Sequence, residues 1–263
     1  MGELGQIILK KIIQKIEEAG VFVAFVGKVL RYFVRRPIRF HLFLQQIELL
    51  GVNSVSIILL AGLAIGMIFA LQMIILIQPF QAEIGVGAAV AVAMAQELAP
   101  IITTLMLIAK NGSAMAAELG TMKVTEQIDA LESMSVDAIH YLVVPRVVAS
   151  LLIFPILTML ANVVGALGAL FIAIGLYKID GASYVDYMFG VLRPAHIYIG
   201  LIKASIMGFM VSTICCFHGL QVTQGAKGVG DGATKAVVTA SVSILIADYL
   251  LASFLNPLFF AVR

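Results

Sequence analysis

Charged residues are scarce in this chain. Only 12% of its 263 residues are Asp, Glu, Lys or Arg, whereas 61% are hydrophobic, and the mean hydropathy is +1.06. A soluble domain needs more polar surface than this, so the composition excludes an ordinary soluble protein and indicates an integral membrane protein. The formal net charge of +2 is also too small for a nucleic-acid-binding surface.

Several kinds of chemical site are missing as well. Cys215 and Cys216 are adjacent in an apolar run, which suits neither a structural disulfide nor a metal site. No G-x-x-x-x-G-K-[ST] pattern occurs, and the glycine-rich turn before the last apolar run lacks the spacing of a phosphate-binding loop. We therefore expect no catalytic residue and no cofactor in this chain. No metal is expected either, because the histidines lack ligand spacing: His41, His140, His196 and His218.

Long apolar runs fill most of the chain. Crossing about 30 Å of hydrocarbon takes roughly 20 helical residues. Five runs are long enough, within 49–82, 88–116, 147–177, 198–222 and 236–262. The expected fold is an all-α integral membrane protein with five transmembrane helices, in which residues 49–263 form one domain. Small residues four apart, such as Gly62 with Gly66 and Ala161 with Gly165, predict close helix packing.

Lys and Arg are unevenly distributed between the two sides of these helices. Eight of the 17 precede the first run, and the side that holds the N-terminus receives 13 against four on the other side. Positive charge marks the cytoplasmic side, so the N-terminus is predicted to be cytoplasmic. Residues 1–20 lack the apolar core of a secretory signal, so we expect no removable targeting segment.

The first 48 residues are predicted to lie along the membrane. Between residues 4 and 16, isoleucines recur at helical spacing opposite lysines, which is typical of a helix in the inner-leaflet interface. The segment 21–50 carries charges early and is broken at Pro37, which favours an interfacial or elbow helix over a span.

A polar stretch, 110–146, separates the second and third runs on the predicted cytoplasmic side. Within it, Val124, Ile128 and Leu131 fall at helical spacing, which predicts a short amphipathic helix within about 118–134. Such a helix can receive force from a separate ATPase, and from the pattern alone a solvated helix without a partner is an equal alternative. The residues that we assign to ATPase coupling are Glu118, Thr125, Glu126, Asp129 and Glu132.

Three ionisable residues inside the apolar runs are candidates for function: Glu97, Lys203 and Asp248. Such residues are costly in a bilayer and mark functional sites by default. Glu97 precedes Pro100, which removes a backbone hydrogen bond and can kink the helix. Each has a structural alternative: a neighbouring helix could pair with Glu97, Lys203 could snorkel to the interface, and Asp248 could serve packing or dimer contacts.

The polar stretch also resembles a known family. The run NGSAMAAELGTMKVTEQIDALESMSVDAIHYLVVPRVVA, at 111–149, closely resembles the signature of the MlaE family, permease subunits of MCE-type ABC transporters that move lipids across the diderm envelope. The resemblance continues in QELAP at 96–100, in LIKAS at 201–205, and in GAKGVGDGATKAVV through IADYLL at 225–251. It covers most of the chain from about residue 50 onward.

This resemblance implies a homodimeric permease of the bacterial inner membrane whose coupling helix docks on a cytoplasmic ABC ATPase. That ATPase would bind ATP and Mg. The resemblance also implies a periplasmic MCE-domain protein as a partner and glycerophospholipid as the cargo. Glu97 matches an acidic residue that lines the lipid cavity. Lys203 and Asp248 are expected at the same cavity, with Lys203 as a point charge for a lipid phosphate.

Two departures from the family pattern leave the charge balance at Glu97 open. Relatives often carry Arg where this chain has Gln96, and their Gly-Arg-Val reads Ala109, Lys110 and Asn111 here. From the residues alone, an ion-coupled secondary transporter that uses Glu97 and Asp248 is an alternative, although we find none of the inverted repeats that often accompany that class. A purely structural membrane scaffold is a third interpretation.

Overall fold

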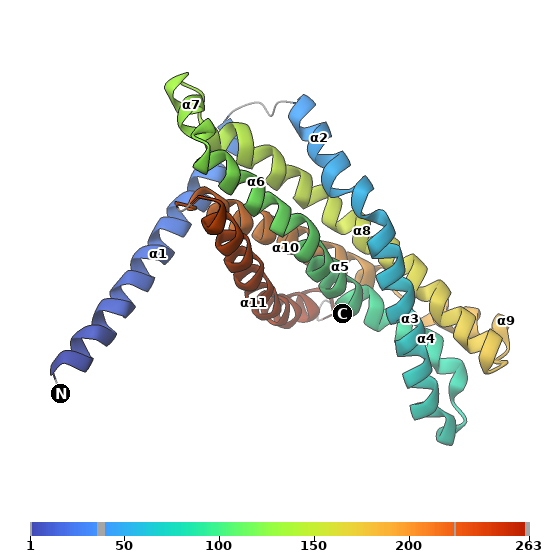
Figure 1. The fold of residues 1–263 in the computed structure, drawn as a ribbon. Helices are drawn as coiled ribbons and strands as arrows, with labels where there is room; N and C mark the ends of the chain where they lie inside the picture. Colours follow the sequence, from blue (N-terminus) through green and yellow to red (C-terminus); the bar gives the residue numbers. More distant parts are fainter. Residues whose placement is uncertain (1, 36–39, 224, 261–263) are drawn as a thin grey trace.

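Every regular element in the described part of the chain is helical (Figure 1). The structure is a computed structural model that describes the backbone of residues 2–35, 40–223 and 225–260, and the side chains of 13, 16–33, 40–223 and 225–259. No β-strand occurs in these ranges. The predicted all-α fold is confirmed.

Five helical segments of the described chain are long and apolar enough to cross a membrane. They are Phe40–Phe80, Glu83–Val124, Ile139–Leu176, Pro194–Leu220 and Gly225–Phe259. Each coincides with one of the apolar runs in the sequence, so the prediction of five spans is confirmed. The protein is a multi-pass membrane protein.

The spans are built from helices of different lengths. The first contains α2 (Phe40–Leu50) and α3 (Val55–Ile77), and the second contains α4 (Val86–Ala93), α5 (Ala99–Leu107) and α6 (Ser113–Val124). The third contains α8 (Val144–Phe171). The last two consist of α10 (Pro194–Leu220) and α11 (Gly225–Phe260). Outside the spans lie α1 (Gly2–Arg35), α7 (Gln127–Ser133) and α9 (Gly181–Val191). In Figure 1, α7 and α2 lie at one end of the bundle and α9 at the other.

Four π-helical turns lie within the second and third spans. Two separate α4, α5 and α6, at Met94–Leu98 and Ile108–Gly112. The other two flank α8, at Ile139–Val143 and Ile172–Leu176. Turns of this kind contain a locally widened backbone ring and are frequent at functional sites.

Helix α1 runs across the direction of the spanning helices and meets the bundle only with its C-terminal half (Figure 1). Phe22 and Phe25 pack on Phe217 of α10, with ring centroids 5.1 and 5.4 Å apart. The Tyr32 hydroxyl donates a hydrogen bond to Asp137, which precedes α8. These contacts fix the end of α1 beside the α7 end of the bundle.

Two helices cover most of the first 50 residues. Helix α1 ends at Arg35 and α2 begins at Phe40, where the first apolar helical segment, Phe40–Phe80, also begins. The interfacial or elbow placement of the segment 21–50 stays a prediction. Pro37 lies outside the described residues. Most side chains of the amphipathic pattern at 4–16 also lie outside the described ones, so the interfacial placement of that helix stays a prediction.

Small residues bring α3 and α8 together backbone to backbone. A Cβ atom added to Gly66 would lie 2.0 Å from the Gly165 carbonyl oxygen, and one added to Gly62 would lie 2.9 Å from the Ala161 oxygen. The two small-residue stripes that the sequence offered separately therefore face each other, and their predicted role in close packing is confirmed. Without a hydrophobic force between helices in lipid, such packing supplies much of the attraction.

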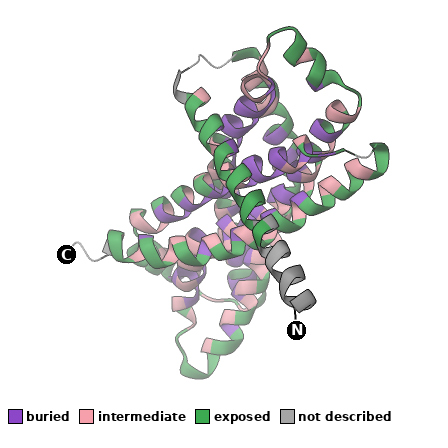
Figure 2. Ribbon diagram, turned by 90° about the vertical axis from the view of Figure 1, so that its left-hand side faces the viewer, coloured by how far each residue is buried: buried purple, intermediate pink, exposed green. Residues whose placement is uncertain are grey.

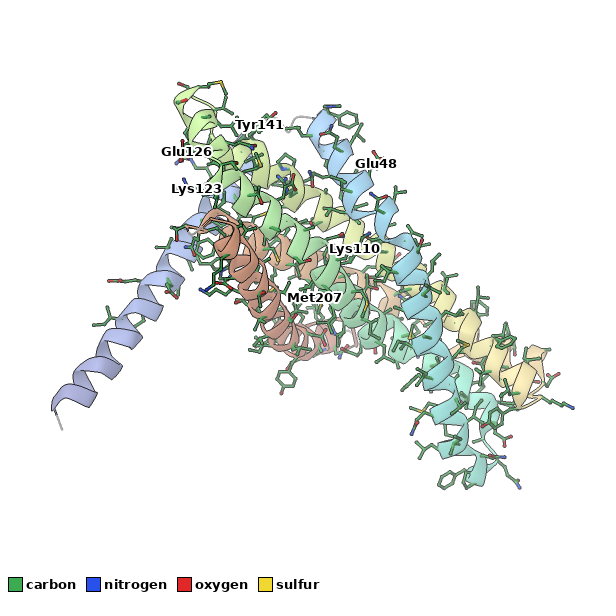
Figure 3. All side chains as sticks on the ribbon, in the orientation of Figure 1. Glu48, Lys110, Lys123, Glu126, Tyr141 and Met207 are labelled. Atoms are coloured by element: carbon green, nitrogen blue, oxygen red, sulfur yellow. The ribbon has the colours of Figure 1, made fainter. Side chains whose placement is uncertain are left out.

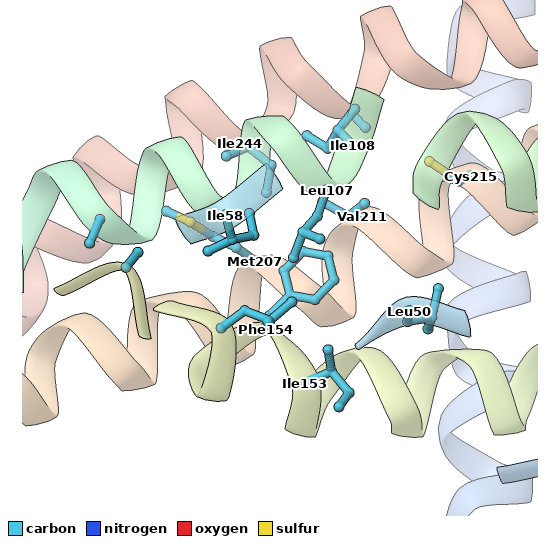
Figure 4. Close-up of a cluster of buried hydrophobic side chains, with 14 of the residues drawn as sticks. Leu50, Ile58, Leu107, Ile108, Ile153, Phe154, Met207, Val211, Cys215 and Ile244 are labelled. Atoms are coloured by element: carbon cyan, nitrogen blue, oxygen red, sulfur yellow. The ribbon is translucent and has the colours of Figure 1, made fainter. Parts of the chain in front are cut away.

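Large side chains fill the centre of the bundle. Ile58, Leu107, Phe154 and Met207 come from four different spans and meet in one buried cluster (Figure 4). Cys215 and Cys216 are both buried and free, as expected for small apolar helix residues. Figure 2 shows that the outer faces of the helices are exposed. Many large apolar side chains lie on these faces, which suits contact with lipid.

We expect Gly66→Ala to destabilise the protein, because the added methyl group meets a backbone carbonyl that cannot rotate away. Overpacking of this kind costs about 1–3 kcal/mol. The measurement is the apparent Tm of the purified protein in detergent. The matched control is Gly190→Ala in α9, where an added Cβ atom meets nothing within 4 Å. Equal loss of Tm in both variants, or no loss in Gly66→Ala, would contradict this account of the α3–α8 contact.

Candidate functional site

The second span is broken at the point where the intramembrane charges gather. Pro100 has no N–H group, so the Gln96 carbonyl lacks the partner that a regular α-helix would supply. The π-helical turn Met94–Leu98 precedes this proline. Gly200 of α10 packs against the turn, since a Cβ atom there would lie 1.9 Å from the Ala95 carbonyl oxygen. The absence of a side chain at this glycine lets α10 approach the break closely.

Lys203, about one helical turn after Gly200, is the centre of a cluster of three charges. Its Nζ atom lies 2.5 Å from Glu97 Oε2 and 2.7 Å from Asp248 Oδ1. The same ammonium donates a hydrogen bond to the Gln96 carbonyl oxygen at 3.2 Å, so it reaches the carbonyl that Pro100 leaves without a helical donor. We call Glu97, Lys203 and Asp248 the charge cluster. It ties the second, fourth and fifth spans together.

The members of the charge cluster differ in exposure. The side chain of Lys203 is fully buried, that of Asp248 is 9% exposed, and that of Glu97 is 37% exposed. A buried charge is tolerated only when it is paired and hydrogen-bonded, and each charge here has an opposite partner. Glu97 is therefore the member of the cluster that a ligand can reach most easily.

The structure brings the three predicted cavity residues together. Their contact with lipid stays a prediction, but two details differ from the expectation. Lys203 does not snorkel to an interface: its fully buried ammonium donates hydrogen bonds to Glu97 and to the Gln96 carbonyl and lies 2.7 Å from Asp248 Oδ1, so it presents no exposed surface to a lipid phosphate. Glu97 also has the pairing with a neighbouring helix that the structural alternative required. Function and structural pairing thus coexist at this residue.

An apolar cavity of about 440 Å³ adjoins the same π-helical turn. Met94 and Ala95 line one side of it, and α8 and α9 line the others. Its most polar wall residue is Asn162, whose amide nitrogen and oxygen are buried without a hydrogen-bond partner among the described residues. The cavity therefore offers a buried polar amide in an otherwise largely apolar space beside the π-helical turn that carries Glu97.

Helix α9 covers this cavity at one end of the bundle. The Asp180 carboxylate accepts a hydrogen bond from the Ser183 N–H at 2.8 Å and caps the helix, which holds the pKa of Asp180 below its ordinary value. Tyr184 lines the cavity and packs its ring over Gly87 of α4. Burial raises the pKa of Tyr184 to about 12. No signal in the sequence distinguishes α9 from a loop, because this segment is short and partly polar.

The predicted coupling segment, about 118–134, is divided into two helices. Its first part completes α6, and α7 begins only at Gln127. Glu126 adopts a left-handed conformation with φ of 60°, which ends the helical path, so the amphipathic helix starts three residues later than the spacing from Val124 predicted. Ile128 is buried, as predicted for its apolar face.

The five predicted coupling residues are exposed at this end of the bundle, where Figure 3 shows Lys123 and Glu126: Glu118, Thr125, Glu126, Asp129 and Glu132. Two of them have partners. Lys123 Nζ lies 2.7 Å from Asp129 Oδ1, and Arg146 Nη2 lies 2.8 Å from Glu118 Oε2. The pair with Asp129 is exposed and contributes little to stability. The role of these residues in coupling stays a prediction.

Arg146 is an element of the site that the sequence analysis missed. Its side chain is 5% exposed, and it joins Glu118 of α6 to the Leu142 carbonyl at the start of the third span, with Nη1 donating at 2.6 Å. In the sequence, Arg146 stands out only as the last charge before the third apolar run. The available signal was a single arginine directly before a long uncharged run.

A second polar junction joins the first two spans. Lys110 Nζ donates to the Asn53 carbonyl and, at 3.0 Å, to Ser54 Oγ (Figure 3 shows Lys110 beside α3). Asn111 Nδ2 donates to the Leu50 carbonyl at 3.0 Å. Two departures from the family pattern, Lys110 and Asn111, therefore hold the α2–α3 junction against the second π-helical turn. They do not take part in the charge cluster.

These features define a membrane-spanning transport subunit. Five helices cross the bilayer, three of them share a buried charge cluster at a helix break, and a polar helical segment projects from one end. Among the described residues, no three His, Cys, Asp or Glu side chains are placed to hold a metal ion.

Comparison with known proteins identifies the family. The family model described as Permease MlaE matches residues 43–254. A probable ABC transporter permease protein of Rickettsia bellii is 36% identical over 255 residues, which are 96% of each chain. The intermembrane phospholipid transport system permease protein MlaE of Haemophilus influenzae is 35% identical over 213 residues, 81% of this chain and 82% of that one. The chloroplastic protein trigalactosyldiacylglycerol 1 of Arabidopsis thaliana is 38% identical over 228 residues, 87% of this chain and 65% of that one.

The chain belongs to the MlaE permease family, and the resemblance read from its sequence is confirmed. Its relatives include proteins named as permeases of ABC transporters and of a phospholipid transport system, and this chain is a permease of the same family.

We expect Lys203→Met to destabilise the bundle strongly, because it leaves two carboxylates facing each other without a cation. Removing one partner of a buried ion pair costs about 3–5 kcal/mol. The triple variant Lys203→Met, Glu97→Gln, Asp248→Asn removes all three charges and should recover most of that loss. Apparent Tm and size-exclusion profiles in detergent measure both. If Lys203→Met is as stable as the parent protein, the cluster does not hold the three spans together.

Proposed function

We propose that this chain is the transmembrane subunit of an ATP-driven transporter that moves glycerophospholipid between the inner membrane and a periplasmic MCE-domain protein. The charge cluster is the observation that carries the proposal. It places a partly exposed carboxylate and a helix break inside the membrane, where a lipid headgroup would otherwise find only apolar side chains. The apolar cavity lined by Met94 and Ala95 of the same π-helical turn supplies a surface suited to acyl chains.

Energy for transport would come from a separate cytoplasmic ATPase that binds ATP and Mg. The exposed acidic residues around α7 are the proposed docking surface, with the N-terminus on the same, cytoplasmic side as the charge distribution predicts. Helix α6 is 12 residues long and leads from α7 to the second π-helical turn. A push on α7 would pass along α6 to α5 and to the break beside Glu97.

A second copy of the chain completes the proposed transporter. Helix α11 carries Asp248 on its buried side and leaves an apolar stripe exposed, which includes Val238, Val242, Leu245 and Tyr249. These residues follow helical spacing, so they form one continuous face. Packing of two such faces would enclose a space next to both charge clusters, in which the lipid would lie.

The alternative of an ion-coupled transporter loses ground on the names of the relatives. Two Rickettsia relatives that match over 96% of this chain are named as probable ABC transporter permease proteins, and the Haemophilus influenzae relative as a permease protein of an intermembrane phospholipid transport system.

The test is purification from native membranes followed by reconstitution in liposomes. We expect the chain to bring down an ATPase and an MCE-domain protein and to transfer fluorescent phospholipid only with ATP. Charge reversal in Glu126→Lys, Asp129→Lys should reduce transfer by roughly 30-fold, the size expected when an interface loses about 2 kcal/mol. The control is Asp186→Lys, an exposed charge on α9 at the opposite end.

Two results together would refute this function. One is a preparation that contains neither partner. The other is ATP-dependent transfer that is unchanged in the double charge reversal.

A further inference from the structure

The charge cluster also indicates which headgroup the cargo carries. This inference rests on the proposed function and deepens it. We propose that the cluster selects phospholipids with a primary ammonium in the headgroup, such as phosphatidylethanolamine, and that Glu97 binds this ammonium. The lipid phosphate would then lie away from the cluster.

The ammonium of Lys203 is buried among protein acceptors. A lysine ammonium has three N–H donors and no acceptor. Here it meets Glu97 Oε2 at 2.5 Å, Asp248 Oδ1 at 2.7 Å and the Gln96 carbonyl oxygen at 3.2 Å. Its side chain has no exposed surface. A lipid phosphate could bind it only by displacing one of these acceptors.

The charge cluster as a whole carries a negative formal charge. Two carboxylates and one ammonium give the cluster a formal charge of −1. The side chain before Glu97 is the neutral amide of Gln96, and the salt bridges among the described residues bring no second cation to the cluster. The exposed member is the Glu97 carboxylate. A ligand therefore meets an anionic surface, and in a medium of low dielectric constant this surface favours a cation and repels an anion.

Hydrogen bonding to Glu97 distinguishes a primary ammonium from a quaternary one. A carboxylate has about four acceptor positions, and Lys203 occupies one of those on Glu97. An ethanolamine ammonium can donate hydrogen bonds to the others, and charge-assisted hydrogen bonds are about twice as strong as neutral ones. A trimethylammonium has no N–H and binds by charge alone. The expected order is phosphatidylethanolamine, then phosphatidylcholine, then phosphatidylglycerol.

The experiment uses the full complex in liposomes that contain these three lipids in equal amounts with matched acyl chains. Mass spectrometry measures the lipid retained by the purified complex and the lipid transferred with ATP. We expect phosphatidylethanolamine to be enriched over phosphatidylglycerol by roughly tenfold or more, the factor that corresponds to one charge-assisted hydrogen bond.

Variants at Glu97 test the assigned group. Glu97→Gln should abolish the enrichment, whereas Glu97→Asp should retain part of it because the charge is kept. We expect Glu97→Gln to fold, because Lys203 keeps Asp248 as the partner of its ammonium. The control is Asp186→Asn on α9, which removes one exposed acidic charge that is not part of the cluster and should leave the preference unchanged.

Three results would overturn the inference. They are enrichment of phosphatidylglycerol, an unchanged preference in Glu97→Gln, and equal handling of the three lipids, which is the outcome if a proton neutralises Glu97 in place of an ammonium. Equal transfer would leave the proposed function standing. Absence of any ATP-dependent lipid transfer would instead refute the proposed function itself.

Discussion

The arrangement of the spans depends on one buried ammonium. Lys203 contacts a carboxylate from the second span, a carboxylate from the fifth, and the backbone carbonyl that Pro100 leaves without a helical donor. Gly200 makes this possible, because any side chain there would collide with the π-helical turn. Since each of these charges would be costly alone in a bilayer, the three spans that carry them are held in one relative position.

The same constraint links packing to transport. The break at Met94–Leu98 interrupts the second span, Glu83–Val124, and a second π-helical turn follows at Ile108–Gly112, so the span is three short helices and not one rigid rod. Polar contacts hold each piece against a neighbour: the charge cluster at the first turn, Lys110 and Asn111 at the second, and Arg146 at the end of α6. In the proposed transport cycle, relative movement of these pieces would let a force at α7 alter the surroundings of Glu97.

The sequence predicted the number of spans and the small-residue contacts because both follow from local composition and spacing. It also selected Glu97, Lys203 and Asp248, since a charge in an apolar run is conspicuous on its own. Their mutual pairing could not be predicted, because a π-helical turn and the rotation of three helices decide which side chains meet. The start of α7 was placed too early, since nothing in the sequence marks Glu126 for a left-handed conformation.

Binding of the lipid headgroup at Glu97 is tested most directly by a cryo-electron microscopy map of the complex purified from native membranes. The account predicts two copies of the chain, an ATPase against α7, and lipid density whose headgroup contacts Glu97 while Lys203 stays bound to Asp248. A map in which the lipid lies elsewhere in the membrane domain, or in which Lys203 leaves its carboxylates to bind the lipid phosphate, would contradict it.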